Sequence, residues 1–427
     1  MNKTSHKARI LADRHPVFTI HTPSIEFSND SLAIVHRFSA TGGLSFTPTT
    51  RIGGNPTGKE SALTRLALYG SLVESLSYWK ACYSPKIVIE PAIPNEAFRW
   101  FEDLLLNGLM EYRYVNGLPA RFVPGIAWED DNTLTKDVGH KGTVPLVLVS
   151  GGKDSTVTLS LLAQNGPTKA FVLNTLPAAE RVLAAFPDVE IVRGVRSIDP
   201  ALLELNKSGY LNGHTPFSAI LSVISTIAAI LSDASEIIAS NEASAELPFA
   251  SYEGLEVNHQ YSKGIRYEKI FAKLITQTIP GAPPWFSFLR PLSEPQICRL
   301  LSKRKELLSL ISSCNRNQSV GSWCGSCPKC VSTWILMLPF INQAELKKLF
   351  GRDALEEGKY LLPALLGKNG CRPLECVGTP EELDASLRSA AGEKEPLNRF
   401  LSQYSTHLLP ERYERLHKVA LEEAKDA

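Results

Sequence analysis

Hydrophobic residues follow two different spacings in the first third of the chain. Between residues 17 and 50 they partly alternate with polar residues, a pattern that predicts short strands. These strands are expected at 17–20, 24–27 and 32–38. Over 61–80 and 95–106 apolar residues instead recur at a helical spacing, which predicts helices. Residues 1–140 are therefore expected to form an α+β domain.

Strongly apolar runs alternate with helical patterns over residues 144–240. Strands are predicted at 146–149, 170–173, 189–192 and 236–240, and helices after the first strand up to Gln164, at 177–186 and at 215–231. Uniformly apolar strands separated by helices predict a parallel sheet with helices on both faces. We expect a doubly wound α/β domain over 141–345 and a helical C-terminal region over 346–427. In that region Thr379-Pro380-Glu381-Glu382 predicts the start of a helix.

The sequence Ser150-Gly151-Gly152-Lys153-Asp154-Ser155 lies between the first of these strands and its helix. Backbone N–H groups at the positive end of a helix hold phosphates, and glycines let the backbone approach them closely. Lys153 adds positive charge, Ser150 and Ser155 offer hydroxyl groups, and Asp154 can hold Mg²⁺. The spacing is not that of the Walker loop. It resembles the PP-loop of the ATP pyrophosphatases, whose adenine-nucleotide alpha-hydrolase-like fold splits ATP into AMP and pyrophosphate. A plain Gly-Gly turn is the alternative.

Four of the eight cysteines are close together in the sequence. Cys324, Cys327 and Cys330 have the spacing Cys-x2-Cys-x2-Cys, and Cys314 lies shortly before them. Four thiolates complete a tetrahedral shell for structural Zn²⁺. An iron–sulfur cluster and free buried thiols are the alternatives.

Composition and charge limit the kinds of partner. The chain has 427 residues, 44% of them hydrophobic, and a formal net charge of +1. This charge indicates neither a nucleic acid nor a membrane as partner. We find no signal peptide and no stretch long enough to span a bilayer, so we expect a cytoplasmic protein. The sequence leaves the oligomeric state open.

Ligands of doubly wound sheets bind at the carboxyl ends of the strands. This rule places His214, at the start of a long helix, and Glu242, after a later strand, beside the 150–155 loop. His259 and Lys263 follow in a dense polar cluster, for which a surface loop is the alternative. His259 suits proton transfer near neutral pH, and Lys263 could pair with a carboxylate or phosphate. Glu242 could bind Mg²⁺ or act as a base, and His214 could stay neutral and donate to a substrate oxygen.

Several segments together resemble the MurL family of ATP-dependent epimerases of peptidoglycan synthesis. The resemblance is carried by residues 213–219, 240–245, 257–263, 288–294, the cysteine segment, Glu375-Cys376-Val377-Gly378-Thr379, 77–80 and 108–112. Two positions differ from the family pattern, because Ala243 stands where glycine is expected and Gly264 where serine is expected. Either difference could mark a homologue that acts on another peptide.

The resemblance implies a reaction on UDP-MurNAc-L-Ala-L-Glu. ATP and Mg²⁺ would adenylate the α-carboxylate of the terminal glutamate, and inversion at Cα would precede hydrolysis to the D-glutamyl product. Two proton carriers would act on opposite faces of Cα, with His259, Glu242, Lys263 and Cys376 as candidates. One rival is a ligase of the same superfamily, similar to cyanodeazaguanine synthase, that activates a carboxylate for amide or nitrile formation. Another is a nucleotide-binding regulatory module without turnover.

Overall fold

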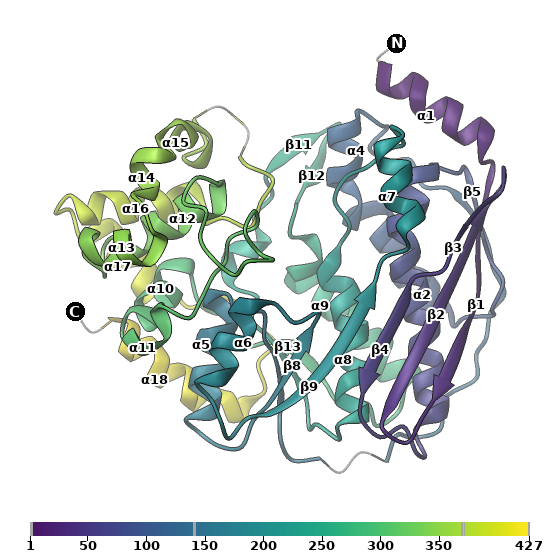
Figure 1. Ribbon diagram of the computed structural model, residues 1–427, viewed down its shortest axis with the longest axis horizontal. Helices are drawn as coiled ribbons and strands as arrows, with labels where there is room; N and C mark the ends of the chain where they lie inside the picture. Colours follow the sequence, from purple (N-terminus) through teal and green to yellow (C-terminus); the bar gives the residue numbers. More distant parts are fainter. Residues whose placement is uncertain (1–2, 140–141, 369, 371, 426–427) are drawn as a thin grey trace. The chain divides into compact units, whose positions relative to one another are not determined.

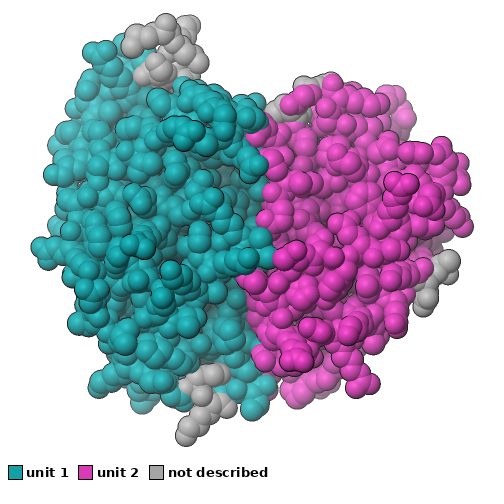
Figure 2. Space-filling model, turned by 180° about the vertical axis from the view of Figure 1, so that it is seen from behind, with its two compact units in different colours: residues 1–143, 192–237, 251–285 teal, residues 144–191, 238–250, 286–427 magenta. Residues whose placement is uncertain are grey.

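The computed structural model describes residues 3–139, 142–368, 370 and 372–425. It divides into two compact units, each made of several chain segments (Figure 2). Unit 1 comprises 1–143, 192–237 and 251–285, and unit 2 comprises 144–191, 238–250 and 286–427. The chain passes between the units more than once, and the three consecutive domains expected from the sequence stay a prediction.

Unit 1 is built on a mixed sheet. Its strands are β1 (Val17–Phe27), β2 (Ser31–Ala40), β3 (Leu44–Phe46), β4 (Thr49–Gly53), β5 (Lys86–Ile89), β6 (Gly125–Ala127) and β9 (Glu190–Ser197), which ends in this unit. They lie in the order β9-β4-β2-β1-β5-β6, with β3 paired to β2 (Figure 1). The strands predicted at 17–20 and 24–27 form one strand, whose pairing with β2 shifts between His21 and Ser24. Pro23 lies within this shift and has no N–H to donate, which accounts for the irregularity.

Unit 1 also contains seven α-helices among its described residues, of which α2 and α8 pack against strands of this sheet. They are α1 (Lys3–Arg14), α2 (Glu60–Cys82), α3 (Asn95–Asp103), α4 (Met110–Asn116), α7 (Pro200–Lys207), α8 (Phe217–Leu231) and α9 (Ile265–Thr278). Almost every residue of α2 is buried, and it packs against α8 and the first strands. The predicted helix 95–106 is confirmed as α3, but it widens into a π-helix over Leu104–Gly108 before α4 begins. Smaller elements of this region are β11 (Ala250–Tyr252), which begins in unit 2, β12 (Leu255–Val257) and the 3₁₀ turn η3 (Tyr261–Lys263).

Unit 2 contains the helical C-terminal region and strands at three of the four positions predicted for the parallel sheet, whereas the strand predicted at 189–192 is β9. Strands β13 (Trp285–Ser287), β10 (Ile237–Ala239), β7 (Leu146–Leu148) and β8 (Lys169–Leu173) lie in that order, and β7 pairs with β8 in parallel. Helices α5 (Lys153–Ala163) and α6 (Pro177–Ala184) follow β7 and β8, as predicted. The protein is therefore a mixed α/β protein.

The C-terminal region is helical (Figure 1). Its helices are α10 (Glu294–Ser302), α11 (Lys305–Leu308), α12 (Pro328–Met337), α13 (Gln343–Phe350), α14 (Ala354–Glu357), α15 (Leu362–Leu365), α16 (Pro380–Ala390), α17 (Glu395–Ser402) and α18 (Glu414–Lys425). The predicted start of α16 is confirmed, because Thr379 and Glu382 form a capping box. Side chains from β7, β8, α5 and these helices share one hydrophobic core, which includes Val147, Val172 and Trp334. Within the described parts of the chain, no helix has both the length and the apolar character needed to cross a bilayer.

Candidate functional site

The 150–155 loop joins β7 to α5 by a turn that requires glycine. Gly151 has a φ of 78°, and a Cβ atom there would lie 2.3 Å from backbone atoms of Ala178 and Ala179. Both the backbone angle and the close packing exclude a larger residue. The sequence therefore fixes a tight turn that directs the chain into the N-terminus of α5.

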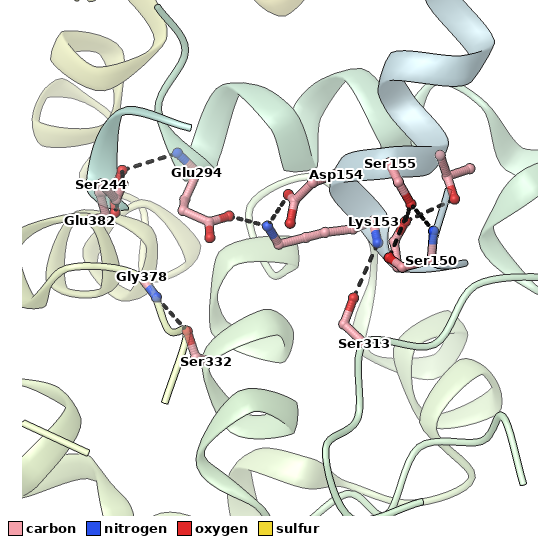
Figure 3. Close-up of polar contacts among 12 residues, drawn as sticks. Ser150, Lys153, Asp154, Ser155, Ser244, Glu294, Ser313, Ser332, Gly378 and Glu382 are labelled. Carbon is pink, nitrogen blue, oxygen red and sulfur yellow. Dashed lines mark hydrogen bonds and ion pairs between the residues drawn. The ribbon is translucent and has the colours of Figure 1, made fainter. Parts of the chain in front are cut away.

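Hydroxyl groups gather at the N-terminus of α5. The Ser155 Oγ accepts from the Ser150 N–H at 3.2 Å and lies 3.3 Å from the Ser150 Oγ (Figure 3). The Lys153 N–H donates to the Ser313 Oγ at 3.1 Å. A helix leaves its first N–H groups without intrahelical acceptors, and its dipole places partial positive charge there. The N-terminus of α5 is thus suited to an anion such as phosphate.

The Lys153 side chain points away from these serines and toward carboxylates. Its ammonium group is buried and forms ion pairs with Asp154 and Glu294 (Figure 3). Burial lowers the pKa of Lys153, but the two carboxylates outweigh burial and raise this pKa well above its usual value. Burial also raises the pKa of Glu294 to about 7, with Asp154 and Glu242 acting in the same direction and Lys153 opposing them.

A buried glutamate from the C-terminal region holds Glu294 in place. The Glu382 carboxylate accepts from the Glu294 N–H at 3.0 Å and from the Ser244 hydroxyl at 2.7 Å (Figure 3). It also accepts from the Thr379 N–H at 2.9 Å. One carboxylate thus connects the starts of α10 and α16 with the turn that follows Glu242. The sequence identified Glu382 only as a helix cap and missed this connection.

Glu242 lies with the loop in unit 2. It is buried and precedes the 3₁₀ turn η2 (Ala243–Glu246). The Arg290 guanidinium donates to the Glu242 carbonyl at 2.9 Å and pairs with Glu246 at 3.1 Å. The Glu242 carboxylate is one of the groups that raise the pKa of Glu294, and its role beside the 150–155 loop stays a prediction. Cys376 is half-buried in the segment that leads into α16.

The four predicted cysteine ligands come together in unit 2. The Sγ atoms of Cys314, Cys324, Cys327 and Cys330 all lie within 4.8 Å of one another. The Sγ atoms of Cys324 and Cys330 are 3.8 Å apart. Thiolates at about 2.3 Å from a tetrahedral Zn²⁺ would be separated by about 3.8 Å, so the cluster fits this ion. The Asn317 and Cys330 N–H groups donate to the sulfurs of Cys314 and Cys327, which favours thiolates there.

The remaining candidates form a second cluster, in unit 1. The Nδ1 atom of His259 lies 2.5 Å from a carboxylate oxygen of Glu111, and the His214 and His259 rings contact with centroids 4.3 Å apart. Burial lowers the pKa of His214 to about 3, and the nearby His259, Lys80 and Lys263 lower it further. The Lys263 ammonium donates to the Gln260 side chain at 3.1 Å. These surroundings favour the neutral imidazole at His214.

Lys80 contacts the residues on both sides of His214 in this cluster. Its ammonium group donates to the Gly213 carbonyl and, at 2.6 Å, to the Thr215 hydroxyl. Burial lowers the pKa of Lys80 to about 8, although the Glu111 carboxylate opposes this change. Lys80 and Glu111 both lie in segments that carried the MurL resemblance, but no role was predicted for either residue. That the two clusters share one crevice stays a prediction.

Known proteins similar to this chain point to one family. Residues 11–288 match the model of the MurL N-terminal domain, and residues 310–418 match that of the MurL C-terminal domain. A Salinispora tropica protein named UDP-N-acetyl-alpha-D-muramoyl-L-alanyl-L-glutamate epimerase is 32% identical over 352 residues, which are 77% of this chain and 75% of the relative. A protein of the same name from Xanthomonas oryzae pv. oryzae is 32% identical over 354 residues, which are 80% of this chain and 77% of the relative. No solved structure matches.

These matches agree with the resemblance found in the sequence. Both domain models match in chain order, and the relatives align along most of the chain. The chain belongs to the MurL family.

Proposed function

We propose that this protein is an ATP-dependent epimerase of peptidoglycan synthesis. The substrate would be UDP-MurNAc-L-Ala-L-Glu, and the products UDP-MurNAc-L-Ala-D-Glu, AMP and pyrophosphate. The observation that carries this proposal is the name shared by relatives that align along most of the chain. The glycine turn and the N-terminus of α5 support the use of a nucleotide.

The reason for using ATP lies in the acidity of the glutamate Cα–H. An ionised α-carboxylate already bears a negative charge, so removal of the adjacent proton would place a second charge beside the first. Transfer of the adenylyl group from ATP to a carboxylate oxygen releases pyrophosphate and removes the first charge. A base can then take the proton, and N–H or cationic groups can stabilise the enolate oxygen.

The 150–155 loop would bind the ATP phosphates as a PP-loop in a doubly wound domain. Ser150, Ser155 and the N–H groups of α5 would contact the phosphates, and Asp154 would hold Mg²⁺, which neutralises phosphate charge. The Asp154 side chain is 35% exposed, whereas the Glu294 side chain is 7% exposed. Asp154 can therefore turn toward a bound nucleotide while Glu294 keeps its contact with Lys153.

The proton carriers would come from the residues singled out in the sequence. His259 is the strongest candidate because its imidazole is paired with a carboxylate. Glu242, Lys263, Cys376 and His214 complete the set, as carriers or as donors to substrate oxygens. The Cys314, Cys324, Cys327 and Cys330 cluster would hold one structural Zn²⁺, which elemental analysis can detect. An enzyme that acts on a UDP-linked precursor would work in the cytoplasm.

Incubation in D2O tests the proposed reaction. With ATP and Mg²⁺, the enzyme should convert UDP-MurNAc-L-Ala-L-Glu into a D-glutamyl product with one deuterium at Cα, and it should release pyrophosphate. Without ATP, inversion and exchange should both stop. His259→Asn should slow exchange more than pyrophosphate release, because adenylation does not need this base.

Other outcomes identify the rivals. Stoichiometric ADP and phosphate would contradict the PP-loop assignment. Pyrophosphate release that depends on ammonia and yields an amide would identify a ligase, the reaction suggested by the combination of loop and cysteine cluster. ATP binding without turnover would indicate a regulatory module. Activity on another peptide only would keep the mechanism and direct attention to Ala243 and Gly264.

A further inference from the structure

Glu111 makes the closest polar contact of His259. Its carboxylate lies 2.5 Å from the imidazole Nδ1, and the two side chains are only 9% and 17% exposed. A carboxylate at this nitrogen keeps the proton on Nδ1 and leaves Nε2 of the neutral ring as the basic nitrogen. It also stabilises the imidazolium that forms when Nε2 takes up a proton.

Glu111 is held by an unusual backbone segment. The π-helix Leu104–Gly108 directly precedes α4, and the buried Arg113 guanidinium donates to the carbonyls of Leu105 and Leu106. Gly108 allows close packing, since a Cβ atom there would lie 3.2 Å from Pro216. These contacts fix the first turn of α4 against the segment that carries His214. π-Helical turns are frequent at functional sites because they redirect the side chains that follow.

Four elements bring charged or titratable groups to His259. Glu111 comes from α4 and His214 from the segment before α8, while Lys80 on α2 and Lys263 in η3 carry ammonium groups. The positive charge of Arg196 lowers the pKa of Lys80. Glu111 therefore brings negative charge to His259 in surroundings where neighbouring ammonium groups oppose the imidazolium.

We propose that Glu111 is the positioning residue of a Glu111–His259 dyad that carries one of the two protons in epimerisation, an inference that rests on the proposed function. His259 Nε2 takes the Cα proton of the glutamyl adenylate, and the C–H electron pair moves into the acyl group to give the enolate. A second carrier returns a proton to the opposite face of Cα. One proton leaves and one enters, so the substrate is inverted without a change in its composition.

The same geometry excludes His214 as the second carrier. Carriers on opposite faces must have the reacting carbon between them, whereas the His214 and His259 rings contact each other directly. His214 would also have no acidic proton to return to Cα, because burial lowers its pKa to about 3 and leaves the ring neutral near neutral pH. Of the other candidates, Lys263 lies in the same cluster as His259.

Glu111→Gln tests this inference, since glutamine keeps the size of the side chain and removes its charge. The rate of deuterium exchange at Cα should fall about 100-fold, within the range typical of general acid–base catalysis. Single-turnover release of pyrophosphate should stay within about twofold of the wild-type rate. The acidic limb of the exchange profile should move to lower pH, because the imidazolium loses its counter-ion. Glu111→Asp should recover part of the exchange rate.

Asp103→Asn is the matched control. Asp103 is a neighbouring carboxylate that bonds to Tyr261 and pairs with Arg266 at 2.9 Å. Its loss should perturb the 258–263 segment without moving the pH limb. Equal effects of the two variants on exchange and pyrophosphate release would overturn the dyad. A second equivalent of bound metal in the wild type that Glu111→Gln loses would also overturn it, because Glu111, His214 and His259 would then be ligands.

Different results would contradict the proposed function and the proposed role of Glu111. Absence of ATP-dependent exchange in the wild-type protein would contradict the function itself. Normal wild-type exchange with an unchanged Glu111→Gln profile would contradict only the role of Glu111.

Discussion

Lys153 in unit 2 and Lys80 in unit 1 are both almost completely buried, with 3% and 5% of their surfaces exposed. Lys153 contacts two carboxylates, and its pKa is raised well above the usual value. Lys80 donates to a carbonyl and a hydroxyl, and burial lowers its pKa to about 8. Burial of an ammonium group therefore does not fix its charge, and the chemistry of the partners decides. The loop keeps a permanent cation, whereas the histidine cluster contains an amine that titrates near the working pH.

Removal of one of the two carboxylates that pair with Lys153 should have the largest effect on activity. Asp154→Ala deletes one of its two partners together with the proposed Mg²⁺ ligand. We expect pyrophosphate release to fall on the order of 10³-fold or more, because phosphate charge is no longer neutralised. The circular dichroism spectrum should not change, since the Asp154 side chain lies in the first turn of α5 and is partly exposed. Asp188→Ala, at an exposed position of the same unit, should keep wild-type activity.

The unfolding free energy should report the lowered pKa of Lys80. Between pH 8 and 10.5 the unfolded chain binds a proton at Lys80 that the folded protein has released, so stability rises with pH through this window. The contribution is about 3 kcal/mol for a shift of this size. Lys80→Met should remove the rise in denaturant titrations, whereas the exposed Lys207→Met should retain it. A slope that Lys80→Met leaves unchanged would mean that Lys80 is charged like Lys153.

Loss of the Glu294 carboxylate should have a smaller effect and should make the surroundings of Lys153 more like those of Lys80. Glu294→Gln leaves Lys153 with Asp154 as its carboxylate partner and removes a buried group that ionises. The pKa of Glu294 is raised to about 7 in the folded state, so its ionisation lowers stability as pH rises from 4.5 to 7. The variant should lack that decline. An unchanged pH dependence would show that Glu294 is fully ionised throughout this range.

Local patterns predicted much of the fold and part of the site. The strand, glycine pair and helix around residues 150–155 are neighbours in the sequence, so spacing alone identified the loop. The same holds for Cys324, Cys327 and Cys330, whose ligand spacing is short. The broadening of a predicted helix into the π-helix 104–108 was not predicted, because its apolar pattern does not differ from that of an α-helix.

Hydrogen bonds between residues far apart in the chain were not predicted, for a different reason. Glu111 and His259 are 148 positions apart, and Ser244 and Glu382 are 138 positions apart. Nothing in the local spacing of either residue indicates its partner, because tertiary packing brings them together. The resemblance to MurL singled out the segments that hold Glu111 and His259, but it did not pair them.

The segment just before the cysteines links the proposed metal site to the nucleotide loop. The Ser312 N–H donates to the Gly151 carbonyl at 3.0 Å, the Ser313 hydroxyl accepts from the Lys153 N–H, and the next residue is Cys314. A zinc ion held by Cys314 would anchor this segment, so metal and nucleotide would each increase the affinity of the protein for the other by the same factor.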